Sequence, residues 1–303
     1  MRAIFLGTSG GIPTPRRSLP AVALMHEGEI MLFDCGEGAQ TQFMRKGIGF
    51  GRLTKIFITH IHGDHLSGLM GLFMTLTMLE REAPLEVYGP PGLAEFFGSL
   101  ERDIKLRARF PYSIHVAAPG MVVRCDGFHV EAAPVNHSVP CLAFAVQESV
   151  RPGKFDLDRA RELGVPEGPL FGSLQKGETV TLPDGGTVSP SDVLGPPRKG
   201  RRVVYCTDTV YHPPIIPFCR EADLLIHESM FAEDMKDEAR MRKHSTAAEA
   251  AGIARAAGVR RLALTHISAR YLDTSDIQEQ ARAVFPETTV ARDLMEIEIP
   301  YID

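Results

Sequence analysis

The sequence predicts an α/β protein built from two halves whose β-sheets face each other. Strand and helix patterns alternate in the first part of the chain, a β-rich stretch follows, and the alternation returns in the last third. A chain of 303 residues is long enough to stack two sheets in one domain. We therefore expect a single domain over residues 1-303.

The elements of the first half are short apolar runs separated by turns and amphipathic segments. Strands are expected near 2-6, 20-25, 30-34 and 55-59, and helices near 37-46 and from Asp64 to about Leu79. The strand at 55-59 ends directly at His60, and Asp64 then suits the positive end of the following helix. This pattern places a group of histidines on a strand-to-helix turn.

The remainder of the chain contains a β-rich stretch, an irregular segment and a second α/β part. Strands are expected near 85-88, 113-117, 121-124, 128-135, 141-147, 202-206, 223-227 and 261-265, and helices near 245-257 and 275-284. Residues 149-200 are instead rich in Gly, Pro and charge. A segment of this kind is either a functional excursion from the core or a plain surface insertion.

Composition and charge restrict the class of protein. The net charge of -5 argues against binding nucleic acid by bulk attraction, although local basic patches can still do so. The five cysteines are scattered and form no C-x-x-C pair, which favours reduced thiols in a cytosol. Residues 1-7 lack a signal-peptide layout, and no apolar run reaches the roughly 20 residues of a membrane span. We expect a soluble cytoplasmic enzyme without a membrane partner.

Residues 60-65, with the sequence HIHGDH, have the pattern of a metal-chelating turn. Two histidines spaced two residues apart point to the same side of an extended backbone. Gly63 permits a tight bend that brings Asp64 and His65 toward a neighbouring position. Hydrolytic zinc takes nitrogen and oxygen ligands and keeps one position open for water, so this turn needs further ligands from elsewhere in the chain.

Three later polar residues, each just after an apolar strand, complete the set. Taken singly, such residues are usually caps or turn residues, but here they accompany the chelating turn. Two metals roughly 3.5–4 Å apart need a bridging group, and a carboxylate can bridge where a histidine cannot. We therefore expect one zinc on His60, His62, His137 and Asp208, and a second zinc on Asp64, His65, Asp208 and His266.

The ligand pattern resembles the metallo-β-lactamase-fold superfamily, which implies an αββα sandwich. The whole chain resembles the short form of the ribonuclease Z family, through residues 5-13 (FLGTSGGIP), 33-38 (FDCGEG), 136-138 (NHS), 207-209 (TDT), 227-228 (HE) and 243-246 (KHST). The resemblance implies a zinc-dependent endoribonuclease that removes the 3′ trailer from precursor tRNA. It also implies that a 3′-hydroxyl remains on the tRNA and a 5′-phosphate on the trailer, and that manganese is a possible substitute for zinc.

Residues 164-171 (GVPEGPLF) resemble the tip of a flexible arm that distinguishes this family within the superfamily. The resemblance implies that residues 149-178 form a protruding arm that binds tRNA, and that the arm of one subunit of a homodimer serves the active site of the other. The basic residues of the segment agree with this function, although each of them is also compatible with a solvated helix face. The expected tRNA-binding residues are Arg151, Lys154, Arg159, Arg161, Gly164, Gly168, Pro169 and Lys176.

The resemblance also assigns catalytic roles to three residues. Asp64 corresponds to the proton acceptor of the family, His244 would stabilise the phosphate or protonate the leaving oxygen, and Glu228 would orient His244. The plainer alternatives are that Asp64 only ligates metal and that His244 merely precedes a helix capped by Ser245.

The loop after the first strand departs from the family pattern. The family typically has Pro-x-Lys-x-Arg-Asn, whereas residues 13-18 (PTPRRS) keep Pro13 and Arg17 but lack the Lys and the Asn. Because this loop helps to read the tRNA 3′ end, discrimination against precursors that carry CCA is left open. Two rival functions also remain, a small-molecule phosphodiesterase or lactonase on the same fold and a metal-free RNA-binding module, and the complete ligand set argues against the second.

Overall fold

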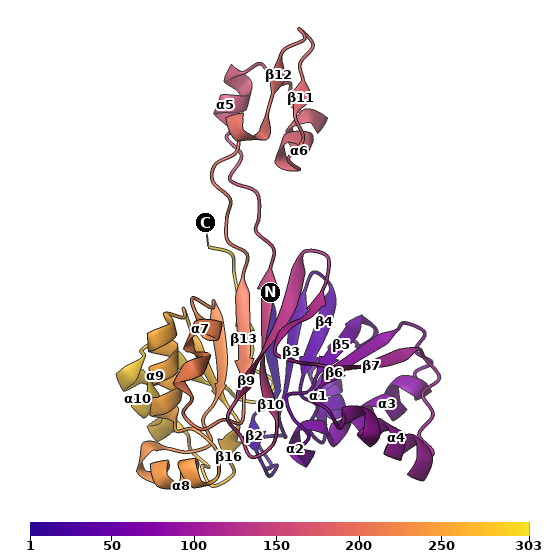
Figure 1. Cartoon of the computed structure of the whole chain (residues 1–303), viewed down its shortest axis with the longest axis vertical. Helices are drawn as coiled ribbons and strands as arrows, with labels where there is room; N and C mark the ends of the chain where they lie inside the picture. The colour runs from indigo at the N-terminus through magenta and orange to yellow at the C-terminus, as the bar shows by residue number, and fades with distance from the viewer. Residues whose placement is uncertain (303) are drawn as a thin grey trace. The chain divides into compact units, whose positions relative to one another are not determined.

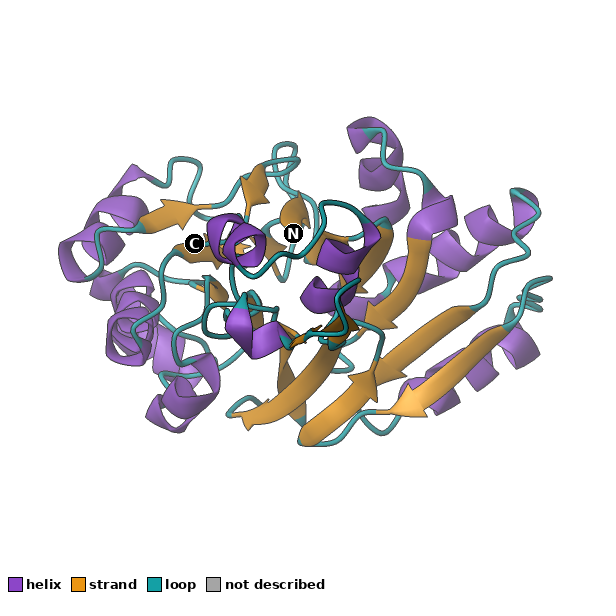
Figure 2. Ribbon diagram, turned by 90° about the horizontal axis from the view of Figure 1, so that it is seen from above, coloured by secondary structure: helices purple, strands orange, loops and turns teal. Residues whose placement is uncertain are grey.

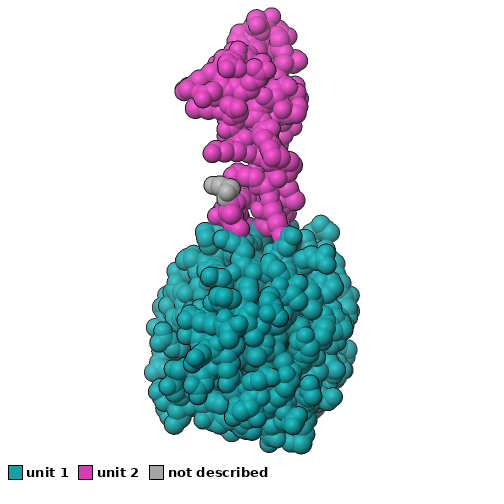
Figure 3. All heavy atoms as spheres, turned by 90° about the vertical axis from the view of Figure 1, so that its left-hand side faces the viewer, with its two compact units in different colours: residues 1–147, 201–300 teal, residues 148–200, 301–303 magenta. Residues whose placement is uncertain are grey.

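The computed structural model describes residues 1–302, which divide into two compact units. Unit 1 comprises Met1–Gln147 and Arg201–Pro300, and unit 2 comprises Glu148–Gly200 with Tyr301 and Ile302 (teal and magenta in Figure 3). The segment 149-178 lies within unit 2, which continues to Gly200. No helix within residues 1–302 is long and apolar enough to cross a membrane.

Unit 1 contains two seven-stranded sheets, with the strand orders β18-β1-β3-β4-β5-β6-β7 and β17-β15-β14-β13-β10-β9-β8. The first sheet consists of β1 (Arg2–Gly7), β3 (Ala21–His26), β4 (Glu29–Phe33), β5 (Leu53–Phe57), β6 (Leu85–Gly89), β7 (Tyr112–Val116) and β18 (Glu296–Glu298). The second sheet consists of β8 (Gly120–Arg124), β9 (Phe128–Val135), β10 (Cys141–Glu148), β13 (Arg202–Cys206), β14 (Leu224–Glu228), β15 (Leu262–Thr265) and β17 (Thr288–Val290). A small parallel pair joins β2 (Ser9–Gly10) to β16 (Ile267–Ser268).

The two sheets face each other across a shared core, and helices cover their outer faces (Figures 1 and 2). Side chains alternate along each strand, so Phe5 of β1 and Tyr205 of β13 enter the core between the sheets, whereas Ile4 and Val204 face the helices. This arrangement confirms the expected αββα sandwich. The first sheet packs on α1 (Ala39–Lys46), α3 (Gly68–Met78) and α4 (Leu93–Asp103), and the second on α7 (Ile216–Cys219), α9 (Ala247–Ala257) and α10 (Ser275–Val284).

Several elements differ from the sequence-based expectation. The helix expected from Asp64 to Leu79 is divided into α2 (Gly63–Leu66) and α3, and the strand expected at 55-59 ends at Phe57. The strand stops early because the Thr59 amide donates to Asp34 Oδ1 at 2.8 Å instead of to a neighbouring strand. Elements not foreseen include α4, β17, β18 and α8 (Lys236–Met241). The strands β17 and β18 have three residues each, too few to show a clear alternation.

Unit 2 has a small hydrophobic core of its own. It contains α5 (Leu157–Glu162), α6 (Pro169–Gln175) and a hairpin of β11 (Val180–Thr181) and β12 (Thr187–Val188). Two segments run side by side at its ends, where the Gly195 amide donates to Lys154 O at 2.9 Å. A Cβ atom at Gly153 would clash with Gly195 O, so this close approach requires glycine. The core residues are Ala160, Val165, Leu174, Val180, Val188 and Val193.

Candidate metal centre

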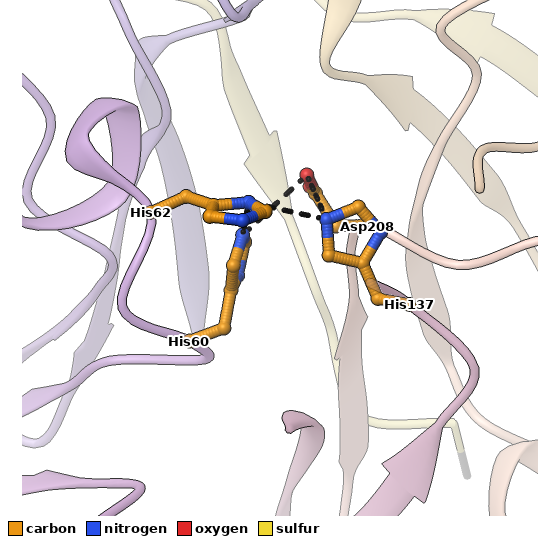
Figure 4. A group of neighbouring side chains, drawn as sticks. All are labelled: His60, His62, His137 and Asp208. Carbon is orange, nitrogen blue, oxygen red and sulfur yellow. Dashed lines mark hydrogen bonds and ion pairs between the residues drawn. The ribbon is translucent and has the colours of Figure 1, made fainter. Parts of the chain in front are cut away.

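The seven predicted ligands come together at one edge of the sandwich, where the strands that precede them end. The ligand atoms of the first group lie within 4.8 Å of one another, and so do those of the second group. Figure 4 shows the first group, in which the three imidazoles and the carboxylate point toward a common centre. The first group is His60, His62, His137 and Asp208, and the second is Asp64, His65 and His266.

In the first group, three imidazole nitrogens and one carboxylate oxygen converge. The Nδ1 atom of His62 lies 3.0 Å from His60 Nε2 and 3.2 Å from His137 Nε2. The Oδ2 atom of Asp208 lies 3.6 Å from His60 Nε2 and 3.7 Å from His137 Nε2. Tetrahedral ligands at the usual zinc–nitrogen distance would be roughly 3.3–3.4 Å apart, so these spacings suit a single ion.

In the second group, the other oxygen of Asp208 takes part. Its Oδ1 atom lies 3.3 Å from His65 Nε2 and 3.2 Å from His266 Nε2. The Oδ2 atom of Asp64 completes the group, at 3.4 Å from His65 Nε2 and 3.5 Å from His266 Nε2. The two oxygens of Asp208 therefore face different groups, which is the geometry that a bridging carboxylate requires.

Burial and unsatisfied atoms show that this donor set fits divalent metal ions. Among residues 1–302, the buried Nε2 atoms of His65 and His266 have no hydrogen-bond partner, and such an atom costs about 1–3 kcal/mol. Burial and the neighbouring His65 lower the pKa of His60 to about 2, so His60 is a neutral donor. Burial opposes a charge on His65, but Asp208 and Asp34 raise its pKa, which shows that their carboxylates make the site favourable for a cation.

Hydrogen bonds to the outer ring nitrogens orient the imidazoles. Asp34 Oδ2 lies 2.8 Å from His65 Nδ1, and Lys243 O lies 3.0 Å from His137 Nδ1. An outer nitrogen that donates leaves the lone pair on the inner nitrogen, where a metal would bind. Asp34 is fully buried, and it also accepts from the Thr59 amide and from the Tyr205 hydroxyl at 2.8 and 2.9 Å. The sequence-based site did not include Asp34, although it directly follows a buried strand as the predicted ligands do.

Replacing Asp34 by Asn is expected to weaken metal binding by about 10–100-fold, since the loss of such an orienting partner typically has this effect. The amide cannot accept from His65 and the Thr59 groups in the same way as a carboxylate. Metal affinity would be measured by competition with a chelator. The control Tyr205→Phe removes another hydrogen bond to the same carboxylate without touching His65. Equal losses in the two variants would show that Asp34 supports the fold rather than the ligand.

The backbone at the site is strained and closely packed. Asp34, Asp208 and His266 have φ angles of 55°, 44° and 56°, a region that L-residues rarely adopt. Such a conformation costs on the order of 1–3 kcal/mol per residue and is typical of functional sites. A Cβ atom at Gly10 would lie 2.6 Å from His266 Nδ1, and the next amide, of Gly11, donates to Asp64 Oδ2 at 3.0 Å. The loop after β1 therefore closes one side of the second group.

His244 lies beside the two metal groups and is held by Glu228. Its Nδ1 atom is 2.9 Å from Glu228 Oε1, and its ring centre is 5.2 Å from that of His137 and 5.3 Å from that of His266. Burial lowers the pKa of His244, but Glu228 outweighs this effect and raises it to about 9. Glu228 thus favours the protonated form of the imidazole, which can donate a proton.

The helix after His244, expected near residues 245-257, begins at Ala247. The N-cap of α9 is Thr246, whose hydroxyl accepts from the Glu249 amide in a capping box, and not Ser245. The Ser245 hydroxyl instead donates to Thr209 O at 2.6 Å, next to Asp208. The segment that carries His244 is thus hydrogen-bonded to the loop that carries Asp208.

Comparisons with known proteins agree with this geometry. Two family models match parts of the chain, "Anti-Pycsar protein Apyc1" over residues 1–109 and "Beta-lactamase superfamily domain" over residues 187–267. The fold is also similar to the metallo-β-lactamase fold protein YhfI from Bacillus subtilis, with a TM-score of 0.70 at 21% identity, over 98% of each chain. These matches support the fold of the chain.

Relatives that match over their full length show the family of the chain as well as its fold. Ribonuclease Z of Methanosarcina acetivorans is 45% identical over 302 residues, which cover 99% of each chain. Ribonuclease Z of Myxococcus xanthus is 46% identical over 308 residues, covering 100% of this chain and 99% of the relative. The crystal structure of human tRNase Z, short form, has a TM-score of 0.73 at 31% identity and covers 99% of this chain and 100% of that one. With this identity over the full length and a site of this geometry, the chain belongs to the ribonuclease Z family of the metallo-β-lactamase fold.

Proposed function

We propose that the chain is a cytoplasmic endoribonuclease that removes the 3′ trailer from precursor tRNA and uses two zinc ions per subunit, with manganese as a substitute. The names of its relatives support the substrate class. The observation that carries the chemistry is Asp208, whose two oxygens face two separate groups of ligands. Divalent ions held by these groups would supply an activated water and would neutralise charge on the scissile phosphate.

Asp64 and His244 would handle the protons of the reaction. Asp64 lies among the ligands and is placed to accept the proton of the attacking water, while the Gly11 amide fixes its carboxylate. The bond between the phosphorus and the 3′ oxygen breaks, so that oxygen needs a proton. The protonated His244, held by the buried Glu228, would provide it. The products would be a 3′-hydroxyl on the tRNA and a 5′-phosphate on the trailer.

We propose that unit 2 is the tRNA-binding arm. Arg159 and Arg161 form exposed ion pairs with Glu162 and Glu167 at 3.0 and 2.6 Å. Exposed pairs of this kind are weak, so both guanidinium groups could exchange their partners for phosphates. Gly164 and Gly168, with φ angles of 73° and 136°, allow the turns around the start of α6. The other proposed contacts are Arg151, Lys154, Pro169 and Lys176.

An exposed apolar surface supports a homodimer. The helix α3 has no charged residue, and Met74 and Met78 on its outer side are 51% and 81% exposed. Met44 of the neighbouring α1 is 57% exposed. An uncharged patch can pair with its own copy about a two-fold axis without burying a charge, and helices that are apolar all round are normally buried. We define this patch, Met44, Met74 and Met78, as the methionine face.

Replacing Met74 and Met78 by Glu is expected to convert the dimer into a monomer, because two like charges would be buried against their copies. Light scattering on a sizing column would measure the mass. The control Met121→Glu/Met241→Glu alters two other exposed methionines, which are 47% and 70% exposed. A wild-type protein that is monomeric, or a charged variant that remains dimeric, would contradict the proposed interface.

The proposed activity is tested by cleaving end-labelled precursor tRNA, with and without an encoded CCA, and mapping the cut to the nucleotide. The expected result is a single metal-dependent cut that leaves a 3′-hydroxyl on the tRNA. The comparison of the two precursors also shows what the altered loop at residues 13–18 does. Turnover of small phosphodiesters without cleavage of the precursor would favour the small-molecule hydrolase, and binding without any cleavage would favour the RNA-binding module.

A further inference from the structure

A polar cavity lies in unit 1 beside the loop formed by residues 11–18. Its volume is about 690 Å³, within the range of pockets that hold small organic ligands. Its walls come from this loop, from the start of α10 and from the segment after β17. The lining residues that matter here are Arg16, Arg17, Leu272, Asp273, Arg292 and Asp293.

The charges of this cavity favour an anionic ligand. The guanidinium groups of Arg16 and Arg292 make no hydrogen bond or ion pair within residues 1–302, and both residues are exposed. The two acidic residues are already engaged. Asp273 accepts from the Ser275 amide and hydroxyl at 3.0 and 2.8 Å, and Asp293 accepts from Thr8, Ser18 and Gln42. The guanidinium groups of Arg16 and Arg292 therefore remain available to bind an anion.

Hydrogen bonds of Arg17 hold one wall of the cavity in place. Arg17 Nη1 donates to Thr8 Oγ1 and to Ala291 O, both at 2.7 Å, so its guanidinium group fastens the loop to the second sheet. Thr274 and Ser275 place the N-terminus of α10 at the wall, where the helix dipole adds positive potential. Within residues 1–302, the cavity therefore combines the hydrogen-bonded Arg17, the guanidinium groups of Arg16 and Arg292, which have no such bond, and the N-terminus of α10.

The cavity is close to the metal centre along two chain segments. Gly11 donates to Asp64 Oδ2, and five residues later the loop reaches Arg16, which is at most about 18 Å away along a fully extended chain. On the other side, Ile267 and Ser268 follow His266 directly, and the chain reaches Leu272 at the cavity four residues later. A strand bound at the metals could therefore reach the cavity within a few nucleotides.

We propose that this cavity binds an unpaired nucleotide of the trailer, downstream of the cleaved bond. Arg16 and Arg292 would contact its phosphate, and Leu272, whose side chain is 73% exposed, would pack on the base or ribose. The concave shape suits a single strand rather than the duplex of an acceptor stem. The proposal rests on the proposed function, because it assigns a subsite for the same substrate.

The test compares precursors with trailers of one and ten nucleotides. For the wild-type enzyme, the longer trailer is expected to lower KM several-fold, and Arg16→Gln/Arg292→Gln is expected to abolish this advantage, so that the variant has the same KM for both precursors. The salt dependence of log(kcat/KM) for the long trailer should also become shallower by about 0.7, since the contact with one phosphate of a single strand is lost. The control Arg220→Gln/Arg255→Gln removes the same charge from two exposed arginines elsewhere in unit 1.

A second measurement does not depend on cleavage. A fluorescent, 2′-O-methylated hexanucleotide with a 5′-phosphate should bind the wild-type protein more tightly than the Arg16→Gln/Arg292→Gln variant in an anisotropy titration. Equal binding by both proteins, or an equal loss in the control variant, would overturn the cavity as a subsite. If precursor tRNA is not cleaved at all, the proposed function fails, and the titration still decides whether the cavity binds a single strand.

Discussion

Asp208→Ala is expected to reduce the metal content from about two ions per chain to fewer than one and to lower phosphodiester cleavage by at least about 10³-fold. The carboxylate faces both sets of ligands, with Oδ2 toward His60 and His137 and Oδ1 toward His65 and His266. Metal-based charge stabilisation is worth several kcal/mol, and each 1.36 kcal/mol corresponds to about tenfold in rate. Metal analysis after dialysis and a chromogenic phosphodiester assay would measure the two effects.

Asp208→Asn provides a graded control. Asparagine has nearly the same shape but only one oxygen, so it can serve one group of ligands and not both. We expect this variant to hold at most about one ion per chain. Thermal unfolding in the presence of a chelator would separate metal loss from a loss of fold, because all the proteins are then metal-free. Two ions per chain in Asp208→Ala would contradict the bridging role.

The residues that cluster as candidate ligands could be predicted from the sequence because their signals are local. The HIHGDH turn is contiguous, and the remote ligands each follow an apolar strand whose pattern is visible over four to eight residues. Asp34 gives the same kind of signal after β4, but what distinguishes it is its contact with His65, 31 residues away. A contact over that distance leaves no periodic pattern in the sequence.

The interior of unit 2 shows the same limit. The composition of residues 149-200 marks an excursion with nearly the bounds of unit 2, but it does not show which residues form the core, such as Val180, Val188 and Val193. Two of them belong to strands of two residues, which are too short for a recognisable alternation. In unit 1, the hydrogen bond from Arg17 to Ala291 O likewise leaves no pattern in the sequence, because it joins residues 274 positions apart. Composition thus marked the segment and its extent, while the packing inside it depends on contacts that leave no pattern in the sequence.

The proposed separation of chemistry from substrate selection rests on where the residues lie. All the ligands, Asp34, Glu228 and His244 belong to unit 1, whereas the basic residues proposed to bind tRNA belong to unit 2. The three hydrophobic clusters of unit 1 include no residue from 148–200 within the described chain. The core that supports the metal centre therefore does not depend on unit 2 for its packing.

Excision of unit 2 is consequently expected to separate the two functions. Replacing residues 155–194 by a short Gly-Ser linker joins Lys154 to Gly195, whose backbone groups are already hydrogen-bonded at 2.9 Å. We expect kcat/KM for precursor tRNA to fall by at least about 100-fold, because binding energy from remote parts of a large substrate is lost, while turnover of a small phosphodiester stays within about twofold. Both activities would be measured on the same preparation, with its metal content.

The matched control keeps unit 2 and reverses part of its charge through Lys154→Glu and Lys176→Glu, which lie outside its core. This variant should lose part of the activity on precursor tRNA and none on the small substrate, and its loss should shrink as salt is raised, because phosphate contacts are screened. Precursor cleavage at the wild-type rate after the excision would contradict the role of unit 2. Both substrates are cleaved at the same metal centre, but only precursor tRNA is proposed to need unit 2 for binding. Equal losses on both substrates would therefore mean that unit 1 needs unit 2 to fold.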